Sequence, residues 1–132
     1  TGDLKIKVFG NTKKELFVNA ALFLIEYLKP IPSAGISQKI IKREISVSSF
    51  DLETLLVDFL TEVLYHIQKY KEVYFRISIK EFIDTPKKEK RIKAEIEGYK
   101  FLHLEEDIKG VTYYGLKIKK NKLWSVTILF DI

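Results

Sequence analysis

The amino-acid sequence predicts a two-layer α+β domain, in which two helices pack on one face of a mixed β-sheet. Three observations lead to this fold class. Both helical patterns lie in the first half of the chain, four to five strand patterns follow the second helix, and the order β-α-β-α then strands lacks the regular alternation of a doubly wound fold. The chain has 132 residues and no second core pattern, so residues 1–132 are expected to form a single domain.

The first strand and the first helix are predicted from a change in periodicity. Residues 3–9 alternate between polar and apolar, which is typical of a half-buried strand. Thr12 and Glu15 have the spacing of a capping box, in which each side chain accepts a hydrogen bond from the other residue's backbone N–H. The helix that begins there should run to about Lys29, because Pro30 disfavours its continuation. Its apolar residues lie around much of its surface, so we expect it to be covered on more than one side.

A loop, a strand and a second helix should follow. Residues 30–37 contain two prolines, a glycine and two serines, which is the composition of a loop. Residues 41–47 are typical of a strand, and Asp51 is expected to be the N-cap of the helix that comes next. The apolar residues of that helix recur at helical spacing and form one stripe that should pack on a sheet: Leu52, Leu55, Leu56, Phe59, Leu60, Val63, Leu64 and Ile67.

The second half of the chain is predicted to be rich in strands, because the apolar period changes from 3.6 to 2 after Tyr70. The expected segments, in order, are a strand at 73–80, a turn at 84–88, a strand at 91–97, a polar loop at 103–109, and a closing hairpin formed by 112–119 and 123–132. The hairpin should turn at the Lys-Asn-Lys segment between its two strands.

Composition limits the class of protein. The chain has no cysteine, which excludes disulfides, thiolate metal sites and cysteine nucleophiles and fits a cytoplasmic location. No apolar run approaches the roughly 18 residues that cross a bilayer, so no membrane association is expected. The net charge of +5 favours anionic partners such as RNA, although a lysine-rich solvated surface is the simpler interpretation. If the chain is a basic RNA-binding module, its footprint is expected at Lys87, Lys88, Lys90, Arg91 and Lys93.

Residues that could carry out catalysis are scarce. His66 is expected on the polar side of the second helix and His103 in an acidic loop. Neither has a serine or carboxylate in a recognisable triad order, so each is expected to be a solvated surface histidine. Asp58, on the polar side of the second helix, is expected to be solvated. The glycines are scattered and form no phosphate-binding loop. We therefore expect no enzyme; a metal-dependent hydrolase is the weaker alternative, because its base and nucleophile are missing.

The last residues are the most unusual feature of the sequence. Val126, Ile128, Phe130 and Ile132 form an apolar row that should hold the end of the chain in the sheet. Asp131 must then point to the face opposite Ile132, next to the terminal α-carboxylate. Such oxygen atoms are the ligands that Ca²⁺ and Mg²⁺ prefer, and a third ligand from elsewhere would complete a site. The alternative is an ordinary exposed strand end with an isolated aspartate.

Three segments, in the same order, resemble the archease family. The first, Thr1-Gly2-Asp3, resembles the end of the His-Thr-Ala-Asp signature at the start of that family's first strand. The second, residues 51–65, is similar to the family's second-helix segment nearly position for position. The third, residues 109–114 with the closing residues 130–132, is similar to the family's Lys-Ala-Val-Thr-Tyr-His segment and its terminal Asp-Ile. Together the three segments span essentially the whole chain.

The resemblance implies a non-enzymatic accessory protein of the RNA ligase that joins 3′-phosphate or 2′,3′-cyclic-phosphate ends to 5′-hydroxyl ends in tRNA splicing and RNA repair. Such a protein promotes guanylylation of the ligase and its multiple turnover, and it meets tRNA only indirectly. The resemblance also implies a divalent ion, Ca²⁺ before Mg²⁺ or Mn²⁺, held by Asp3, Asp131 and the main-chain or terminal oxygen of Ile132. Gly2 replaces the family's usual alanine, Tyr114 stands where many members have histidine, and the basic charge differs from the acidic balance expected of members.

Overall fold

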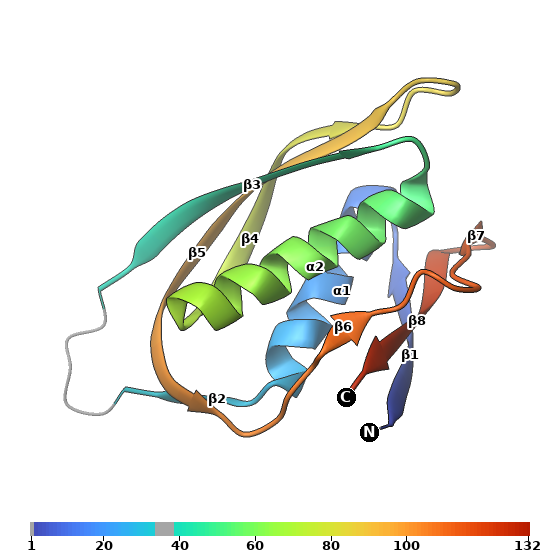
Figure 1. Ribbon diagram of the computed structural model, residues 1–132. Coiled ribbons are helices and arrows are strands. Elements are labelled where there is room, and N and C mark those ends of the chain that lie inside the picture. The colour runs from blue at the N-terminus through green and yellow to red at the C-terminus, as the bar shows by residue number, and fades with distance from the viewer. Residues whose placement is uncertain (1, 34–38) are drawn as a thin grey trace.

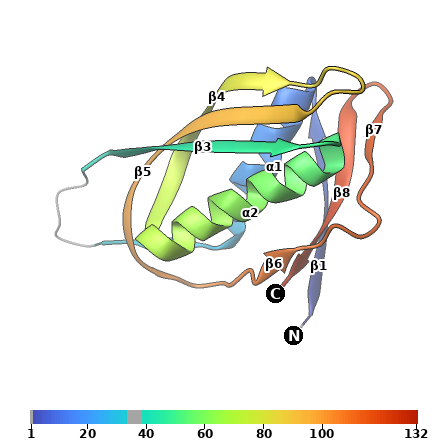
Figure 2. The same cartoon turned by 45° about the horizontal axis from the view of Figure 1, so that its top comes forward.

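In the computed structural model, which describes residues 2–33 and 39–132, two helices pack against two antiparallel sheets (Figure 1). The elements are, in order, β1 (Asp3–Gly10), α1 (Lys13–Tyr27), β2 (Pro30–Pro32), β3 (Ile41–Ser49), α2 (Leu52–Tyr70), β4 (Glu72–Ile83), β5 (Lys90–Leu104), β6 (Gly110–Val111), β7 (Ile118–Lys120) and β8 (Trp124–Asp131). Figure 2 shows β3, β4 and β5 as one layer and β1 with β8 as another. Helix α1 contacts β1 and β8 of one layer and β4 of the other.

The first sheet joins the two ends of the chain. Strand β8 pairs with β1 along one edge and with β6 and β7 along the other. Its alternate apolar residues, Val126, Ile128 and Phe130, are buried and lie directly opposite the apolar residues of β1. Directly opposite residues of antiparallel strands point to the same face, so the polar residues of both strands gather on the outer face.

The second sheet is built around β5, which pairs with β3 and β4 along most of its length and with β2 near its end. Its alternate residues Ile92, Ala94 and Ile96 are fully buried in the core. Gly98 continues this row. A Cβ atom there would lie 1.9 Å from the Val73 carbonyl oxygen, so the close approach of β4 to β5 requires glycine at this position.

Both helices form where the sequence patterns place them. The apolar stripe of α2 is buried from Leu55 to Ile67, and α2 contacts β3, β4 and β5. Asp51 is its N-cap, as predicted, and its carboxylate accepts hydrogen bonds from the Thr54 N–H at 2.7 Å and the Thr54 hydroxyl at 3.0 Å. Since α1 contacts both sheets, the expectation that it is covered on more than one side is confirmed.

The start and the end of α1 differ slightly from the prediction. The Thr12 hydroxyl accepts from the Glu15 N–H at 3.1 Å, as expected. The Glu15 carboxylate, however, accepts from the N–H of Asn11 at 3.1 Å, one residue before the position that a capping box specifies. The helix ends at Tyr27 rather than near Lys29, because Lys29 adopts a left-handed conformation with a φ of 47°.

The α+β class is confirmed, but the arrangement of the strands differs from the prediction. Every pairing found in residues 2–33 and 39–132 is antiparallel, and the strands form two sheets instead of one mixed sheet. The reason is the broad apolar surface of α1, which needs a sheet on each side. No helix in this part of the chain is long and apolar enough to cross a membrane.

The boundaries of several other segments also differ from the prediction. Strand β2 occupies the start of the predicted loop at 30–37, of which residues 34–37 lie outside the described ranges. Strand β5 continues to Leu104, into the predicted polar loop. The first arm of the closing hairpin is reduced from 112–119 to β7, which still pairs with β8 across the predicted turn.

Candidate metal centre

The two ends of the chain meet in the first sheet. Asp3 and Asp131 are direct partners in the β1–β8 ladder. Beyond them, the Gly2 N–H donates to the Ile132 carbonyl oxygen at 3.2 Å, and the Ile132 N–H donates to the Gly2 carbonyl oxygen at 3.0 Å. Figure 1 shows the N and C ends side by side. The expectation that the apolar row holds the end of the chain in the sheet is therefore confirmed.

The two aspartates point to the same face, because directly opposite residues of an antiparallel pair share a face. Both are exposed, whereas Phe130 on the other face is fully buried and Ile132 packs at the edge of the core. Asp131 thus lies opposite Ile132 in the pleat, as the alternation predicts. Two carboxylates on adjacent strands repel each other unless a cation lies between them or near them.

Asp131 is the centre of this group, because β8 lies between β1 and β6. Its partner on β6 is Gly110, and a Cβ atom at Gly110 would lie 3.7 Å from Asp131 Oδ2. The Lys109 N–H donates to the Asp131 carbonyl oxygen at 2.7 Å, which fixes the backbone that carries the carboxylate. Asp131 is therefore held from both sides, with no side chain on Gly110 to cover it.

The oxygen atoms at this site are of the kind that a hard cation prefers, but they are too few to complete its coordination. Among the described residues, neither Asp3 nor Asp131 forms an ion pair with a lysine or arginine. No group of three His, Cys, Asp or Glu side chains that could hold a metal occurs in that part of the chain. The Ile132 carbonyl oxygen already accepts a hydrogen bond from Gly2, and its second lone pair is the remaining donor. Two carboxylates and one carbonyl leave further positions to water or to a partner.

The segment after β6 is anchored to α2 by a contact that the sequence did not predict. The Tyr113 hydroxyl donates a hydrogen bond to the Asp58 carboxylate, 55 positions away in the sequence. This hydrogen bond is the main reason why the pKa of Tyr113 is raised to about 12, and burial of the side chain is the second reason. The expectation that Asp58 is merely solvated is wrong, because it ties this segment to the helix.

Tyr114, the next residue, has no such role in packing. Its side chain is 91% exposed, while the preceding Thr112 N–H donates to the Leu129 carbonyl oxygen at 2.9 Å and keeps the segment on β8. The exposed Tyr114 side chain is one that a partner protein could cover.

The two histidines differ in their surroundings. His66 Nδ1 lies 2.8 Å from the Glu62 carbonyl oxygen and the ring packs against Tyr70, so its side chain is only 14% exposed. The expectation of a solvated residue is therefore wrong for His66. His103 is exposed, as expected.

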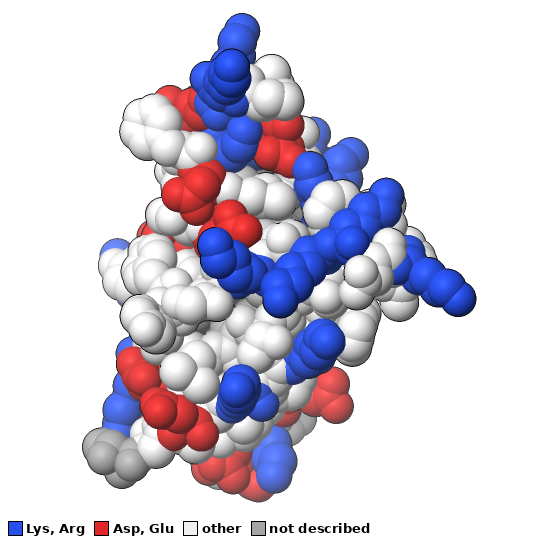
Figure 3. Space-filling model, turned by 90° about the vertical axis from the view of Figure 1, so that its right-hand side faces the viewer, with Lys and Arg blue, Asp and Glu red and all other residues white. Residues whose placement is uncertain are grey.

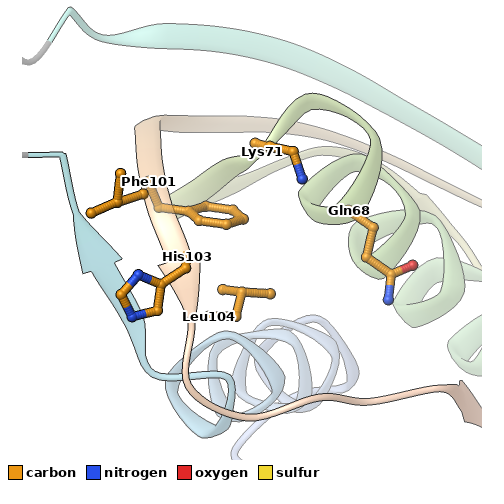
Figure 4. Close-up of a pocket in the computed structure, with 6 residues that line it drawn as sticks. Gln68, Lys71, Phe101, His103 and Leu104 are labelled. Atoms are coloured by element: carbon orange, nitrogen blue, oxygen red, sulfur yellow. The ribbon is translucent and has the colours of Figure 1, made fainter.

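His103 belongs to a hollow of about 270 Å³ between the end of α2 and the end of β5. Figure 4 shows the Phe101 ring and Leu104 on the side of β5 that faces α2, with the His103 ring on the other side. The remaining residues that line the hollow are Gln68, Lys71 and Leu102. The lining thus consists of three apolar residues, one amide, one lysine and His103, whose ring lies on the side of β5 away from α2.

The basic footprint predicted at 87–93 is partly used to hold the β4–β5 hairpin together. Lys90 is nearly buried, and its ammonium group donates to the Thr85 carbonyl oxygen at 2.6 Å and pairs with Asp84 at 3.4 Å. Arg91 pairs with Glu81 at 3.7 Å. Both charges therefore pair within the hairpin, and the Lys90 ammonium group in particular is not free to contact RNA.

The structure also contains a buried ionic cluster that the sequence patterns did not predict. Glu72 is fully buried and accepts two hydrogen bonds from Arg43, at 2.7 and 2.8 Å, and one from the Tyr74 hydroxyl at 2.8 Å. Burial by itself raises the pKa of Glu72, but the bonds from Arg43 and Tyr74 outweigh it, so the pKa lies below its ordinary value. The Arg43 guanidinium lies 3.5 Å from the Tyr70 ring centroid, which also fixes the end of α2.

Comparisons with known proteins agree with this fold and with the sequence resemblance. Residues 1–132 match the Archease protein family (MTH1598/TM1083). The archease of Methanosarcina acetivorans is 35% identical and that of Pyrococcus abyssi 30% identical; both alignments cover 100% of this chain, with 91% and 94% of the relatives.

Two solved structures have the same fold. One is a crystal structure from Thermotoga maritima, described as an archease and possible chaperone, with a TM-score of 0.67, 20% identity, and coverage of 98% of this chain and 90% of that one. The other is the solution structure of Methanobacterium thermoautotrophicum protein 1598, with a TM-score of 0.70, 20% identity, and coverage of 100% and 94%. Sequence match over the full length, relatives above 30% identity and a shared fold lead to one conclusion: the chain belongs to the archease family.

Proposed function

We propose that this protein is a non-enzymatic accessory factor that activates an RNA ligase and that binds a divalent ion at its paired chain ends. The ligase joins 3′-phosphate or cyclic-phosphate ends to 5′-hydroxyl ends in tRNA splicing and RNA repair, in the cytoplasm. The accessory factor promotes guanylylation of the ligase and its multiple turnover. The Thermotoga maritima relative, described as a possible chaperone, supports a role that is exerted on another protein.

The proposal that an ion binds here rests on one observation. Asp3 and Asp131 are exposed direct partners on one face of the sheet, and no lysine or arginine pairs with either of them in the described ranges, although the chain has 23 such residues. Like charges directly opposite each other are destabilising in a β ladder. Lys5 lies on the same face two residues from Asp3 but pairs with neither aspartate, so the site is suited to a cation of higher charge.

The residues that would hold the ion are Asp3, Asp131 and the Ile132 carbonyl oxygen. Oxygen donors of this kind suit Ca²⁺ first, and Mg²⁺ or Mn²⁺ as alternatives. A bound ion would neutralise the two carboxylates and leave coordination positions for oxygen atoms of the ligase. The pairing of Lys109 and Gly110 with β8 places the Tyr113–Tyr114 segment on the same sheet, so that edge and segment can meet one partner surface.

Asp131→Asn tests the proposed role, because asparagine keeps the shape of the side chain and removes its charge. We expect Ca²⁺ affinity, measured by titration calorimetry, to fall at least tenfold, since a ligand that binds the ion directly is lost. Stimulation of ligase guanylylation and of multiple turnover should fall with it. A label from GTP on the ligase measures the first, and the number of RNA joints formed per ligase measures the second.

The matched control is Asp107→Asn, which removes one exposed carboxylate from the loop between β5 and β6. It changes the net charge by the same amount and should leave both measurements unchanged. Stimulation by Asp131→Asn equal to that of the unaltered protein would remove the site from the mechanism. Loss of Ca²⁺ binding without loss of stimulation would leave the ion as a structural one only.

A further inference from the structure

Several lysines on the outer face of the first sheet take part in none of the contacts described above. Lys7 on β1 and Lys119 on β7 flank β8, opposite Thr127 and Ser125 respectively. With Lys117 and Asn121 these side chains surround a hollow of about 280 Å³. We refer to these six residues, Lys7, Lys117, Lys119, Asn121, Ser125 and Thr127, as the lysine face.

The charges of this face are unpaired. Within residues 2–33 and 39–132, Lys7, Lys117 and Lys119 form no ion pair with a carboxylate, in contrast to Lys90 and Arg91 of the β4–β5 hairpin. Figure 3 views the molecule from this side and shows lysine and arginine side chains gathered in a band across its middle. Three ammonium groups around one hollow repel each other, and an anion between them would remove that cost.

The neighbours of these lysines suit a phosphate group. The Ser125 and Thr127 hydroxyls and the Asn121 amide line the same hollow and add neutral hydrogen-bond donors to the ammonium groups. Phe9 is the direct partner of Ser125 on β1, so its ring lies on the same face, where it is half exposed with the Lys7 ammonium group 5.4 Å from its centroid. Lysines beside an exposed aromatic ring form the usual surface for single-stranded nucleic acid, where the backbone meets charge and a base stacks.

We propose that the lysine face, together with Phe9, binds single-stranded RNA through a backbone phosphate in the hollow and a base on the Phe9 ring. An acidic protein surface would be attracted by the same lysines, but it would not need an exposed aromatic ring or the hydroxyl donors that line the hollow. The inference is independent of the proposed ligase partner and of the proposed metal centre. It replaces the basic footprint expected at 87–93 with a different face of the molecule.

The first experiment titrates a labelled oligouridylate of about 16 nucleotides with the full chain over a salt series, by fluorescence anisotropy. The variant Lys7→Gln/Lys117→Gln/Lys119→Gln should bind at least tenfold more weakly at low salt. If the three lysines contact phosphates, the slope of log affinity against log salt should become shallower by about 2, since each contact on a single strand contributes roughly 0.7. The matched control is Lys87→Gln/Lys88→Gln/Lys93→Gln, which removes the same charge from the footprint that the sequence suggested.

Two further variants separate RNA recognition from bulk charge. Thr127→Val keeps the shape and the charge and removes one donor, and we expect it to weaken binding about threefold. Phe9→Ala should weaken binding about tenfold without changing the salt slope, because stacking releases no counterions. Circular dichroism and thermal unfolding confirm that each variant is folded.

Several outcomes would overturn the proposal. Equal loss of affinity in the two triple variants would mean that only net charge matters. RNA binding too weak to measure at 50 mM salt, or no effect of Phe9→Ala, would exclude a built RNA surface. Unchanged RNA affinity in the lysine-face variant with weaker binding to the ligase would assign this face to an acidic protein partner instead.

Discussion

Glu72 lies fully buried where α2 passes into β4, and its charge is stabilised by Arg43, Tyr74 and, at 3.7 Å, Lys100. Removing one member of a buried ion pair leaves the other without compensation, which typically costs about 3–5 kcal/mol. The cluster joins β3, α2 and β4, because Arg43 also lies on the Tyr70 ring. A single carboxylate therefore fixes three elements to each other.

We expect Glu72→Gln to lower the free energy of unfolding at pH 7 by about 3 kcal/mol in urea titrations. The pKa of Glu72 lies below its ordinary value in the folded protein, so its contribution is complete above the unfolded pKa of about 4.3 and is lost as pH falls through the folded pKa. The difference between the two proteins should therefore shrink in acid. Glu89→Gln, in the exposed turn, is the control and should change the free energy of unfolding at pH 7 by less than about 0.5 kcal/mol. A difference that is constant from pH 7 to pH 3 would contradict this role of the charge.

Tyr114 allows a test of whether the Tyr113–Tyr114 segment meets the ligase. Because its side chain is 91% exposed, Tyr114→Ala should change stability by less than about 0.5 kcal/mol. If the ligase covers this ring, the concentration of the variant that gives half-maximal ligase stimulation should rise about tenfold, with Ca²⁺ affinity unchanged. Leu102→Ala removes another exposed apolar side chain, from the far end of β5, and should have no effect on stimulation. Equal effects of the two substitutions would speak against a specific contact.

Two contacts of the candidate site illustrate what a sequence can reveal. A strand that carries Asp131 at the end of the sequence could be predicted from the apolar alternation of 126–132, whereas its meeting with Asp3 was expected only from the family resemblance. The bond from Tyr113 to Asp58 could not. Each of these residues has a polar group on a side that the pattern assigns to solvent, and nothing in the local spacing shows that the two segments are neighbours. The pairing of β6 with β8 and the contact between β6 and α2 bring them together.

At the scale of the elements, the identity of each helix and most strands followed from periodicity, but the division into two sheets did not. A period of two shows which residues of a strand share a face, and it does not show which strand lies beside it. The length of β5 was missed for a related reason. Its last residues pair with β2, a three-residue strand at the start of the predicted loop, and so short a partner has no pattern of its own.

The second sheet also contains a position where one added carbon should separate two strands. The Cβ of Gly98→Ala would lie 1.9 Å from the Val73 carbonyl oxygen, and a backbone atom in a paired strand cannot move aside cheaply. We expect a loss of about 3 kcal/mol in the free energy of unfolding, measured by urea denaturation. Gly110→Ala is the control, since its Cβ would have only an ordinary contact of 3.7 Å with Asp131 Oδ2. Similar stability of the two variants would show that β4 can shift away from β5.

At the scale of the whole molecule, the proposed metal centre and the lysine face lie on the same outer face of the first sheet. Asp3 and Lys7 are four residues apart on β1, roughly 14 Å along an extended strand. The two carboxylates should repel RNA bound at the lysine face, and a charge pair at that separation in water is worth about 0.3 kcal/mol. Neutralising both carboxylates should therefore strengthen RNA binding about threefold.

The repulsion between the two carboxylates and the bound RNA can be recognised by its dependence on salt. The electrostatic screening length is about 30 Å at 10 mM salt and about 8 Å at 150 mM. The roughly 14 Å between Asp3 and Lys7 is therefore shorter than the screening length at 10 mM and longer than it at 150 mM. We expect Ca²⁺ to raise the RNA affinity of the unaltered protein about threefold more than that of Asp131→Asn at 10 mM salt, with no difference at 150 mM. Direct competition of Ca²⁺ for the RNA phosphates is common to both proteins and cancels in the comparison. The same Ca²⁺ effect on both proteins at low salt would show that the ion does not bind at Asp131, whereas a difference that persists at 150 mM would require a structural change that links the two ends of the sheet.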